Sequence, residues 1–281
     1  MFKRFITSIF ILIIAGSCQA NQLLDQAVYD LGRDRHTNLS QMTAVLKKKR
    51  IILVGEHHSK KSHHRAQLAV IQVLADAGTK LAIGLEMFRE DSQSALDQWI
   101  TGELDKADFE RIYYDNWNFP YEAYGMIFNY ARENRIPLIG LNVSRDITRQ
   151  VSRAGFQSLS KEAKEKLSEV TCRVDEAYMQ YIRKAFGAHA HGNLNFIYFC
   201  EAQLVWDNIM AINILNYLRQ NPDAVVVALT GTGHAQKAAV PRQINSRSQM
   251  PYTVILPEVP GKIDAQTVST KEADYIILDL N

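Results

Sequence analysis

The stretch IILVGEHH, residues 51–58, decides the fold that this sequence predicts. Its unbroken aliphatic run is typical of a strand buried on both faces, as the strands of a parallel sheet are. One acid and two histidines follow at the point where that strand must end. Because the carboxyl ends of the strands form the ligand crevice of an open α/β sheet, the stretch predicts a site as well as a strand.

Two more apolar runs end in the same way. Residues 81–85 are followed directly by Glu86, and residues 224–230 are followed by the sequence GTGH, which ends at His234. Helix-type apolar spacing lies between the runs, and this alternation favours parallel strands with right-handed crossovers. We therefore predict an α/β fold with a mostly parallel sheet flanked by helices, and one shared site at the strand ends.

The remaining elements follow from apolar periodicity and from capping and turn residues. Residues 144–218 contain no convincing strand and are too long for one crossover, so we expect part of them to form a helical lobe inserted over the sheet. We expect two amphipathic helices within 22–46, the second with Asn38 or Ser40 as its N-cap. The other expected elements are strands over 50–56, 80–87, 137–143, 223–230, 252–259 and 275–280, one of them an antiparallel edge, and helices over 62–77, 91–101 and 121–134.

Residues 1–18 have the features of an export signal. Lys3 and Arg4 precede an apolar run over 5–14 that is too short to span a bilayer. The sequence AGSC at 15–18 resembles a bacterial lipobox, which predicts lipidation of Cys18 and a single mature domain over 19–281. Ordinary cleavage after Ala20 is the alternative. Residue 19 is not the aspartate that marks inner-membrane retention, so we expect an outer-membrane protein with a lipid anchor.

Composition adds a few limits. The chain has 281 residues, 47% of them apolar, and a formal net charge of +2, which is compatible with one large domain. The basic run Lys47 to Arg50 is interpreted as a solvated helix end, and we predict no nucleic-acid partner. Export would permit one disulfide between Cys172 and Cys200, and two buried free thiols are the alternative.

The acids and histidines at the strand ends suggest two kinds of chemistry. Imidazole and carboxylate are ligands of borderline divalent cations, so His58, Glu86 and His234 are the candidate metal ligands. Glu56 is then a fourth ligand or a general base. In the metal-free alternative, Glu56 or a histidine is the general base of a hydrolase. The four residues are therefore also the candidate catalytic residues.

The predicted lobe contains a second candidate site. Tyr178 and Tyr181 are spaced to lie on one face of a helix, and Tyr198 follows in the aromatic sequence FIYF. Phenolate is a hard anionic ligand suited to ferric haem, and histidine is the commonest other ligand. The candidate haem-binding residues are Tyr178, Tyr181, Tyr198, His189 and His191. Aromatic residues at helical spacing also commonly form a core, and which tyrosine would ligate iron stays open.

Together these motifs resemble the ChaN family of haem-binding bacterial lipoproteins, in a superfamily with the erythromycin esterases and the TIKI metalloproteases. The match follows nearly the whole mature chain in order. The residues that carry it are ILVGEHH at 52–58 with His63, His64 and Gln67, LEMF at 85–88, Trp117, IPLIGLN at 136–142, Arg153-Ala154-Gly155, Ala202-Gln203, Trp206-Asp207, Met210-Ala211, GTGH at 231–234 and Pro241-Arg242.

The resemblance implies an iron-regulated lipoprotein that binds haem through tyrosine, with two haems face to face in a homodimer. Its relatives imply hydrolysis at two Gly-x-x-His motifs, which residues 55–58 and 231–234 both fit, with Glu86 as the acid. The first functional hypothesis is therefore a lipoprotein that takes up or transfers haem or iron at the outer membrane. The alternative is a metal-dependent hydrolase of the esterase or protease type, and whether the chain is an enzyme stays open.

Overall fold

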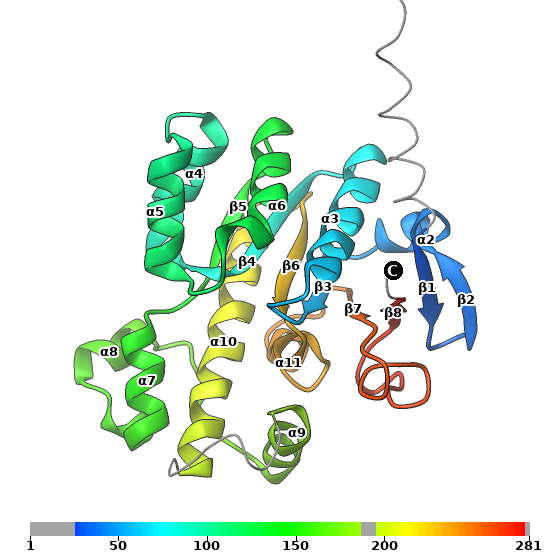
Figure 1. Ribbon diagram of the computed structural model, residues 1–281. Helices are drawn as coiled ribbons and strands as arrows, with labels where there is room; N and C mark the ends of the chain where they lie inside the picture. Colours follow the sequence, from blue (N-terminus) through cyan, green and yellow to red (C-terminus); the bar gives the residue numbers. More distant parts are fainter. Residues whose placement is uncertain (1–25, 187–194, 279–281) are drawn as a thin grey trace, which may run out of the picture.

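One mixed sheet forms the centre of the molecule, with strands in the order β2-β1-β8-β7-β3-β6-β4-β5 (Figure 1). The structure is a computed structural model that describes residues 26–186 and 195–278. Its strands are β1 (Ala27–Asp30), β2 (Arg35–Asn38), β3 (Ile51–Glu56), β4 (Leu81–Arg89), β5 (Leu138–Asn142), β6 (Val225–Gly231), β7 (Tyr252–Pro257) and β8 (Tyr275–Ile277).

The strands from β8 to β5 in this order all run parallel, whereas β1 pairs antiparallel with both β8 and β2. Every residue of β3 and of β6 is buried, as the unbroken apolar runs predict. The predicted α/β class with a mostly parallel sheet is therefore confirmed, and the antiparallel edge comes from the beginning of the described chain.

Helices separate the parallel strands as predicted. They are α2 (Leu39–Leu46), α3 (Lys61–Asp76), α4 (Gln93–Thr101), α5 (Lys106–Asn116), α6 (Tyr121–Glu133), α7 (Arg145–Ala154), α8 (Lys161–Lys166), α9 (Glu176–Phe186), α10 (Phe196–Gln220), α11 (Thr232–Ala235) and α12 (Val240–Asn245), with 3₁₀ turns η1 (Glu90–Ser92) and η2 (Phe156–Ser158). Helix α5 was not predicted. Asn38 caps α2 by accepting a hydrogen bond from the backbone N–H of Gln41, as expected.

The prediction of a first N-terminal helix is wrong. Residues 27–38 form the β1–β2 hairpin instead, with Val28 paired to Thr37 on one side and to Ile277 of β8 on the other. Val28 is fully buried there. The free edge of β8 supplies backbone hydrogen-bond partners that the sequence of the segment alone does not reveal.

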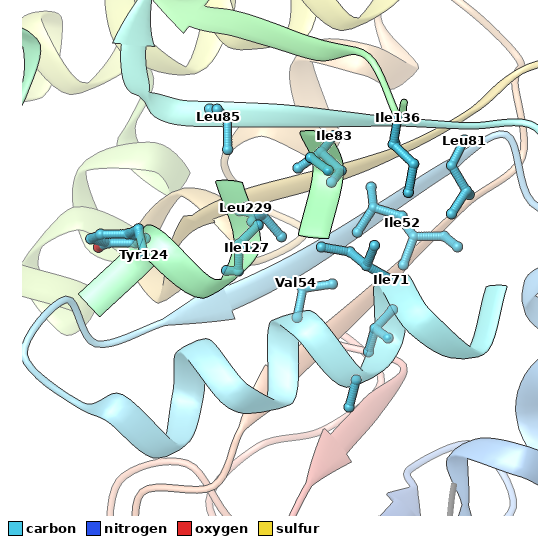
Figure 2. Close-up of a cluster of buried hydrophobic side chains, with 14 of the residues drawn as sticks. Ile52, Val54, Ile71, Leu81, Ile83, Leu85, Tyr124, Ile127, Ile136 and Leu229 are labelled. Carbon is cyan, nitrogen blue, oxygen red and sulfur yellow. The ribbon is translucent and has the colours of Figure 1, made fainter. Parts of the chain in front are cut away.

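The two faces of the sheet carry separate cores, because successive side chains of a strand point to opposite faces. Ile52 and Val54 of β3 face a core covered by α2 to α6, and Figure 2 shows part of it, including Tyr124 and Ile127 of α6. Ile51 and Leu53 face the opposite core, which α10 and α12 cover. The fold is therefore a three-layer arrangement of helices, sheet and helices.

The connections diverge between β3 and β6, which are neighbours in the sheet. Helix α3 follows β3 and covers one face, whereas α11 and α12 follow β6 and contribute to the core on the other face. Such a switch point opens a crevice at the carboxyl ends of the two strands. The fold thus places residues 56–58 and 231–234 on either side of that crevice.

The segment between β5 and β6 contains the predicted helical lobe. The C-terminal half of α10 packs on the sheet, and its N-terminal half extends past the sheet between α7 and α9 (Figure 1). Cys172 and Cys200 both contact the α9–α10 core and are free thiols. Within the described ranges, no helix has the length and apolar character needed to cross a membrane.

Candidate functional site

Glu56 is the most deeply buried acid at the strand ends, with no exposed side-chain surface. Its Oε1 lies 2.6 Å from Nδ1 of His58 and accepts a hydrogen bond of 2.5 Å from the Tyr124 hydroxyl. Its Oε2 lies 2.9 Å from Nε2 of His64 on α3. A carboxylate from β3 is thus surrounded by three polar side chains from the loop after β3 and from two helices. We name Glu56, His58, His64 and Tyr124 the Glu56 cluster.

The charges in this cluster favour an ionised acid. Burial by itself raises the pKa of Glu56, but the hydrogen bonds and charges of His58 and His64 outweigh burial and lower its pKa to about 2. Burial lowers the pKa of His58, whereas its hydrogen bond to Glu56 and the nearby Glu86 carboxylate raise that pKa above the ordinary value. The cluster therefore pairs a buried carboxylate with an imidazole whose protonated form that carboxylate favours.

A second buried pair lies across the crevice. Nδ1 of His234, on the short helix α11, lies 2.7 Å from Oδ1 of Asp207 in the middle of α10. The Tyr178 hydroxyl donates a hydrogen bond of 2.5 Å to the other oxygen of Asp207. Burial lowers the pKa of His234, but the carboxylates of Glu86 and Asp207 reverse this and raise it to about 9.

Glu86 and Gly231 bring the two halves together. The backbone N–H of Gly231 donates a hydrogen bond of 2.6 Å to Oε2 of Glu86, and Nε2 of His234 lies 3.9 Å from Oε1 of the same side chain. A Cβ at residue 231 would lie 3.2 Å from Nε2 of His58 and 3.7 Å from Oε2 of Glu86. Glycine therefore leaves the space that His58, Glu86 and His234 share, and the predicted strand-end residues do lie together.

The structure gives no support to the metal site predicted for His58, Glu86 and His234. Residues 26–186 and 195–278 contain no group of three histidine, cysteine or acidic side chains that could hold a metal ion. Nδ1 of each histidine contacts a carboxylate, which leaves Nε2 as its other nitrogen, and Glu86 accepts a backbone N–H. The arrangement instead suits acid–base chemistry, in which a carboxylate orients an imidazole.

Aromatic side chains cover this crevice. The His58 ring lies edge-on to Trp117, with centroids 5.1 Å apart, and 5.0 Å from Phe119. On the other side, the centroid of Trp206 lies 5.9 Å from that of His234. Only about a quarter of the His58 side chain (26%) is exposed, so the imidazole reaches solvent between aromatic walls.

The candidate haem residues of the lobe differ in their surroundings. Tyr178 is buried and donates to Asp207, and the half-buried Tyr181 donates a hydrogen bond to the carbonyl oxygen of Gly233. The half-buried Tyr198 lies on the first turn of α10, beside Gly155. His189 and His191 lie outside the described residues, as does the predicted lipidation site, Cys18.

Sequence reasoning assigned no role to three members of the site, which are His64, Tyr124 and Asp207. Tyr124 lies on the buried face of a helix that looks like ordinary core, and nothing local marks its hydroxyl as a partner of Glu56. Asp207 could have been found, because it is an ionisable side chain within the apolar stretch LVWDNIMAI of residues 204–212. Acids are almost never fully buried without a partner, so an acid in such a stretch indicates one.

Comparisons with known proteins agree with this architecture. The family model described as "Haem-binding uptake, Tiki superfamily, ChaN" matches residues 42–244. Those residues include both halves of the crevice and the whole lobe. A search of curated protein sequences finds no match.

Among solved structures, ChaN of Campylobacter jejuni, described with cofacial haem binding, has a TM-score of 0.68 and 19% sequence identity, with 91% of this chain and 97% of that chain covered. The type III effector HopBA1 has a TM-score of 0.50 and 13% identity, with 86% of this chain and 93% of that chain covered. An erythromycin esterase mutant, EreC H289N, has a TM-score of 0.49 and 16% identity, with coverages of 78% and 72%. At 19% identity the likeness to the ChaN structure establishes the shared fold.

Proposed function

We propose that this chain, which belongs to the ChaN family of haem-binding uptake proteins in the Tiki superfamily, binds haem and takes part in its acquisition or transfer at the outer membrane. The family match over residues 42–244 carries the proposal. The likeness to a structure described with cofacial haem supports it. Haem supplies a ferric iron that accepts a phenolate ligand, and its apolar faces need cover from side chains.

Tyr198 fits the role of the iron ligand best. The hydroxyls of Tyr178 and Tyr181 already donate hydrogen bonds to Asp207 and Gly233. No described residue accepts a hydrogen bond from the Tyr198 hydroxyl, so ligation there would not break an existing contact. Its neighbour Ile197 is 52% exposed, more than any other large hydrophobic side chain among the described residues, and suits the cover of an apolar ligand face.

The exposed apolar surface also supports a dimer around the ligand. One shallow lobe can cover one haem face, whereas a second copy of the lobe would exclude water from the other face. We infer a homodimer assembled through the start of α10. Light scattering with and without haemin tests this: the mass should double with haemin in the native chain and not in Ile197→Asp. Haem-bound monomers would contradict the dimer.

An absorption titration of the purified protein with haemin tests haem binding. We expect saturation and the ligand-to-metal band of a tyrosinate complex. Tyr198→Phe should remove the band, whereas Tyr178→Phe and Tyr181→Phe should keep it. A native chain that does not saturate with haemin would refute the function. Loss of the band in Tyr178→Phe or Tyr181→Phe alone would move the ligand to α9.

Lipid anchoring is part of the same proposal. The AGSC sequence at 15–18 supports acylation of Cys18, and more than one acyl chain gives stable membrane attachment. Mass spectrometry of the mature N-terminus should find a lipidated Cys18, and Cys18→Ala should abolish the modification. An unmodified N-terminus at Asn21 would rule out the anchor.

Hydrolysis is the second candidate function, and the paired acids and histidines favour it. Buried Glu56 orients His58, and buried Asp207 orients His234, across a crevice lined by aromatic side chains. Such an imidazole can move a proton during acyl transfer. Activity on an aryl ester that His58→Ala abolishes and His57→Ala retains would support it. Equal rates in both variants and the native chain would exclude His58 from proton transfer in this reaction.

A further inference from the structure

A cavity of about 720 Å³ lies beside the lobe, lined by residues before α9, on α9 and α10, and on and after α12. Its size is within the range of small-molecule pockets. None of the strand-end residues Glu56, His58, Glu86 and His234 lines it. We name it the arginine pocket after three of its lining residues, Arg173, Arg242 and Arg247.

The lining of the arginine pocket favours an anion. Three arginines face two acids, Glu169 and Asp175, so the charged lining sums to +1. Asp175 is already used: it pairs with Arg242 and accepts a hydrogen bond of 2.9 Å from the backbone N–H of Tyr178. The Glu169 side chain is exposed, and its backbone carbonyl accepts from Arg247. Glu169 also acts electrostatically on Arg247, and Arg173 on Asp175, so the lining keeps one net positive charge.

Arg242 and Arg247 are both held in place by other residues, Arg242 by its pair with Asp175. Arg247 donates to the Asn208 side chain, to the carbonyl of Gln243 at 3.0 Å and to that of Glu169 at 3.0 Å. Burial lowers the pKa of Arg247, which indicates that water compensates its charge only in part. An anion in the pocket would lie beside this fixed cation.

Arg173 is the arginine of the pocket whose hydrogen-bond donors are not used by other described residues. It is exposed, and no described side chain or carbonyl makes a hydrogen bond or an ion pair with its guanidinium. A guanidinium matches a carboxylate through two parallel N–H donors, which gives both strength and orientation. Tyr178 and Leu204 supply an apolar part of the same lining. The pocket thus combines a carboxylate partner with an apolar wall.

We propose that the arginine pocket binds the carboxylate of an amphiphilic organic acid, with Arg173 as its main partner and Tyr178 and Leu204 against its apolar part. Haem carries two propionate carboxylates and is one such acid. With haem as the ligand, the inference rests on the proposed function, and the pocket gives the lobe a means of orienting haem. A free aromatic acid has the same chemistry and is the second source.

Titrations with two ligand pairs test the proposal. Haemin is compared with haemin dimethyl ester, which lacks the propionate charges, and benzoate is compared with neutral benzamide. The variants are Arg173→Gln, Arg173→Lys and the control Arg111→Gln, whose residue pairs with Asp108 on α5. A lost charge-assisted hydrogen bond weakens binding about tenfold or more. Circular dichroism checks that each variant is folded.

We expect the native chain and Arg111→Gln to bind haemin about tenfold more tightly than its ester, and Arg173→Gln to bind both alike. Arg173→Lys should keep part of the preference. If haemin binds without such a preference, or not at all, benzoate binding that Arg173→Gln abolishes still supports the pocket, with a free acid as the source. A preference that survives in Arg173→Gln, or no carboxylate preference in either pair, overturns the inference. Failure of haemin to bind refutes the proposed function separately.

Discussion

Replacing Glu56 by glutamine should destabilise the protein in a way that depends on pH. The pKa of Glu56 is lowered from the ordinary 4.5 to about 2 in the fold. Each pKa unit corresponds to about 1.4 kcal/mol, so ionisation of this group stabilises the native state by about 3 kcal/mol at neutral pH. Glutamine keeps the shape of the side chain and removes the charge.

The direction of the pH dependence follows from the lowered pKa. The stabilisation by Glu56 is fully present above pH 4.5, where the acid is ionised in the folded and unfolded chains alike. It decreases as the pH falls from 4.5 to about 2, because the unfolded chain takes up the proton first. The difference in unfolding free energy between native chain and Glu56→Gln should therefore shrink across this window.

Urea unfolding at pH 7, 5, 4 and 3, followed by circular dichroism, measures this difference. Glu103→Gln is the matched control, because Glu103 is exposed, and its difference from the native chain should stay near zero at every pH. A Glu56→Gln difference that is unchanged between pH 7 and pH 3 would refute the reasoning. So would a difference of zero at pH 7.

Two more substitutions test packing and pairing away from Glu56. Asp207→Asn removes the acid between His234 and Tyr178 and should lower the free energy of unfolding in urea at pH 7 by about 3–5 kcal/mol. Asp223→Asn, at an exposed position, should leave that free energy almost unchanged. Equal effects of the two substitutions would contradict the buried pair. Gly140→Ala would place a Cβ 2.3 Å from the backbone carbonyl oxygen of Arg89 and should lower the melting temperature more than Gly125→Ala, where the nearest atom is a side-chain carbon 3.1 Å away. The reverse order of melting temperatures would show that this clash is relieved.

The central sheet could be predicted because its signals are local. The runs that become β3, β4 and β6 are apolar on both faces, and the polar residues after them mark their ends. The β1–β2 hairpin could not be predicted, since Val28 is stabilised by pairing with β8, a strand about 250 positions later in the chain. Amphipathic spacing in a short segment is compatible with either structure until its partner is known.

At the strand-end site, the positions of the residues could be predicted from the sequence, but their side-chain partners could not. The topology of a parallel sheet is enough to bring Glu56, Glu86 and His234 to one edge. What each side chain does there depends on partners from distant helices, and these partners changed the outcome. His58 was predicted to bind a metal, and the structure shows that Glu56 holds its Nδ1, while the described residues contain no group of three ligands that supports the metal prediction. Residue type and strand position alone cannot distinguish a ligand from a member of a hydrogen-bonded pair.

Asp207 connects the two candidate functional regions through a single side chain. One oxygen contacts His234 in the strand-end crevice, and the other accepts the hydroxyl of Tyr178 in the lobe. Tyr181 adds a second link from α9, through the Gly233 carbonyl next to His234. If α9 moves when a ligand binds, the contacts of Tyr178 and Tyr181 either break or move with the helix. Both changes alter the surroundings of His234. The proposed haem binding by the lobe and the proposed chemistry at the crevice are therefore expected to be coupled energetically, since the same buried carboxylate serves both.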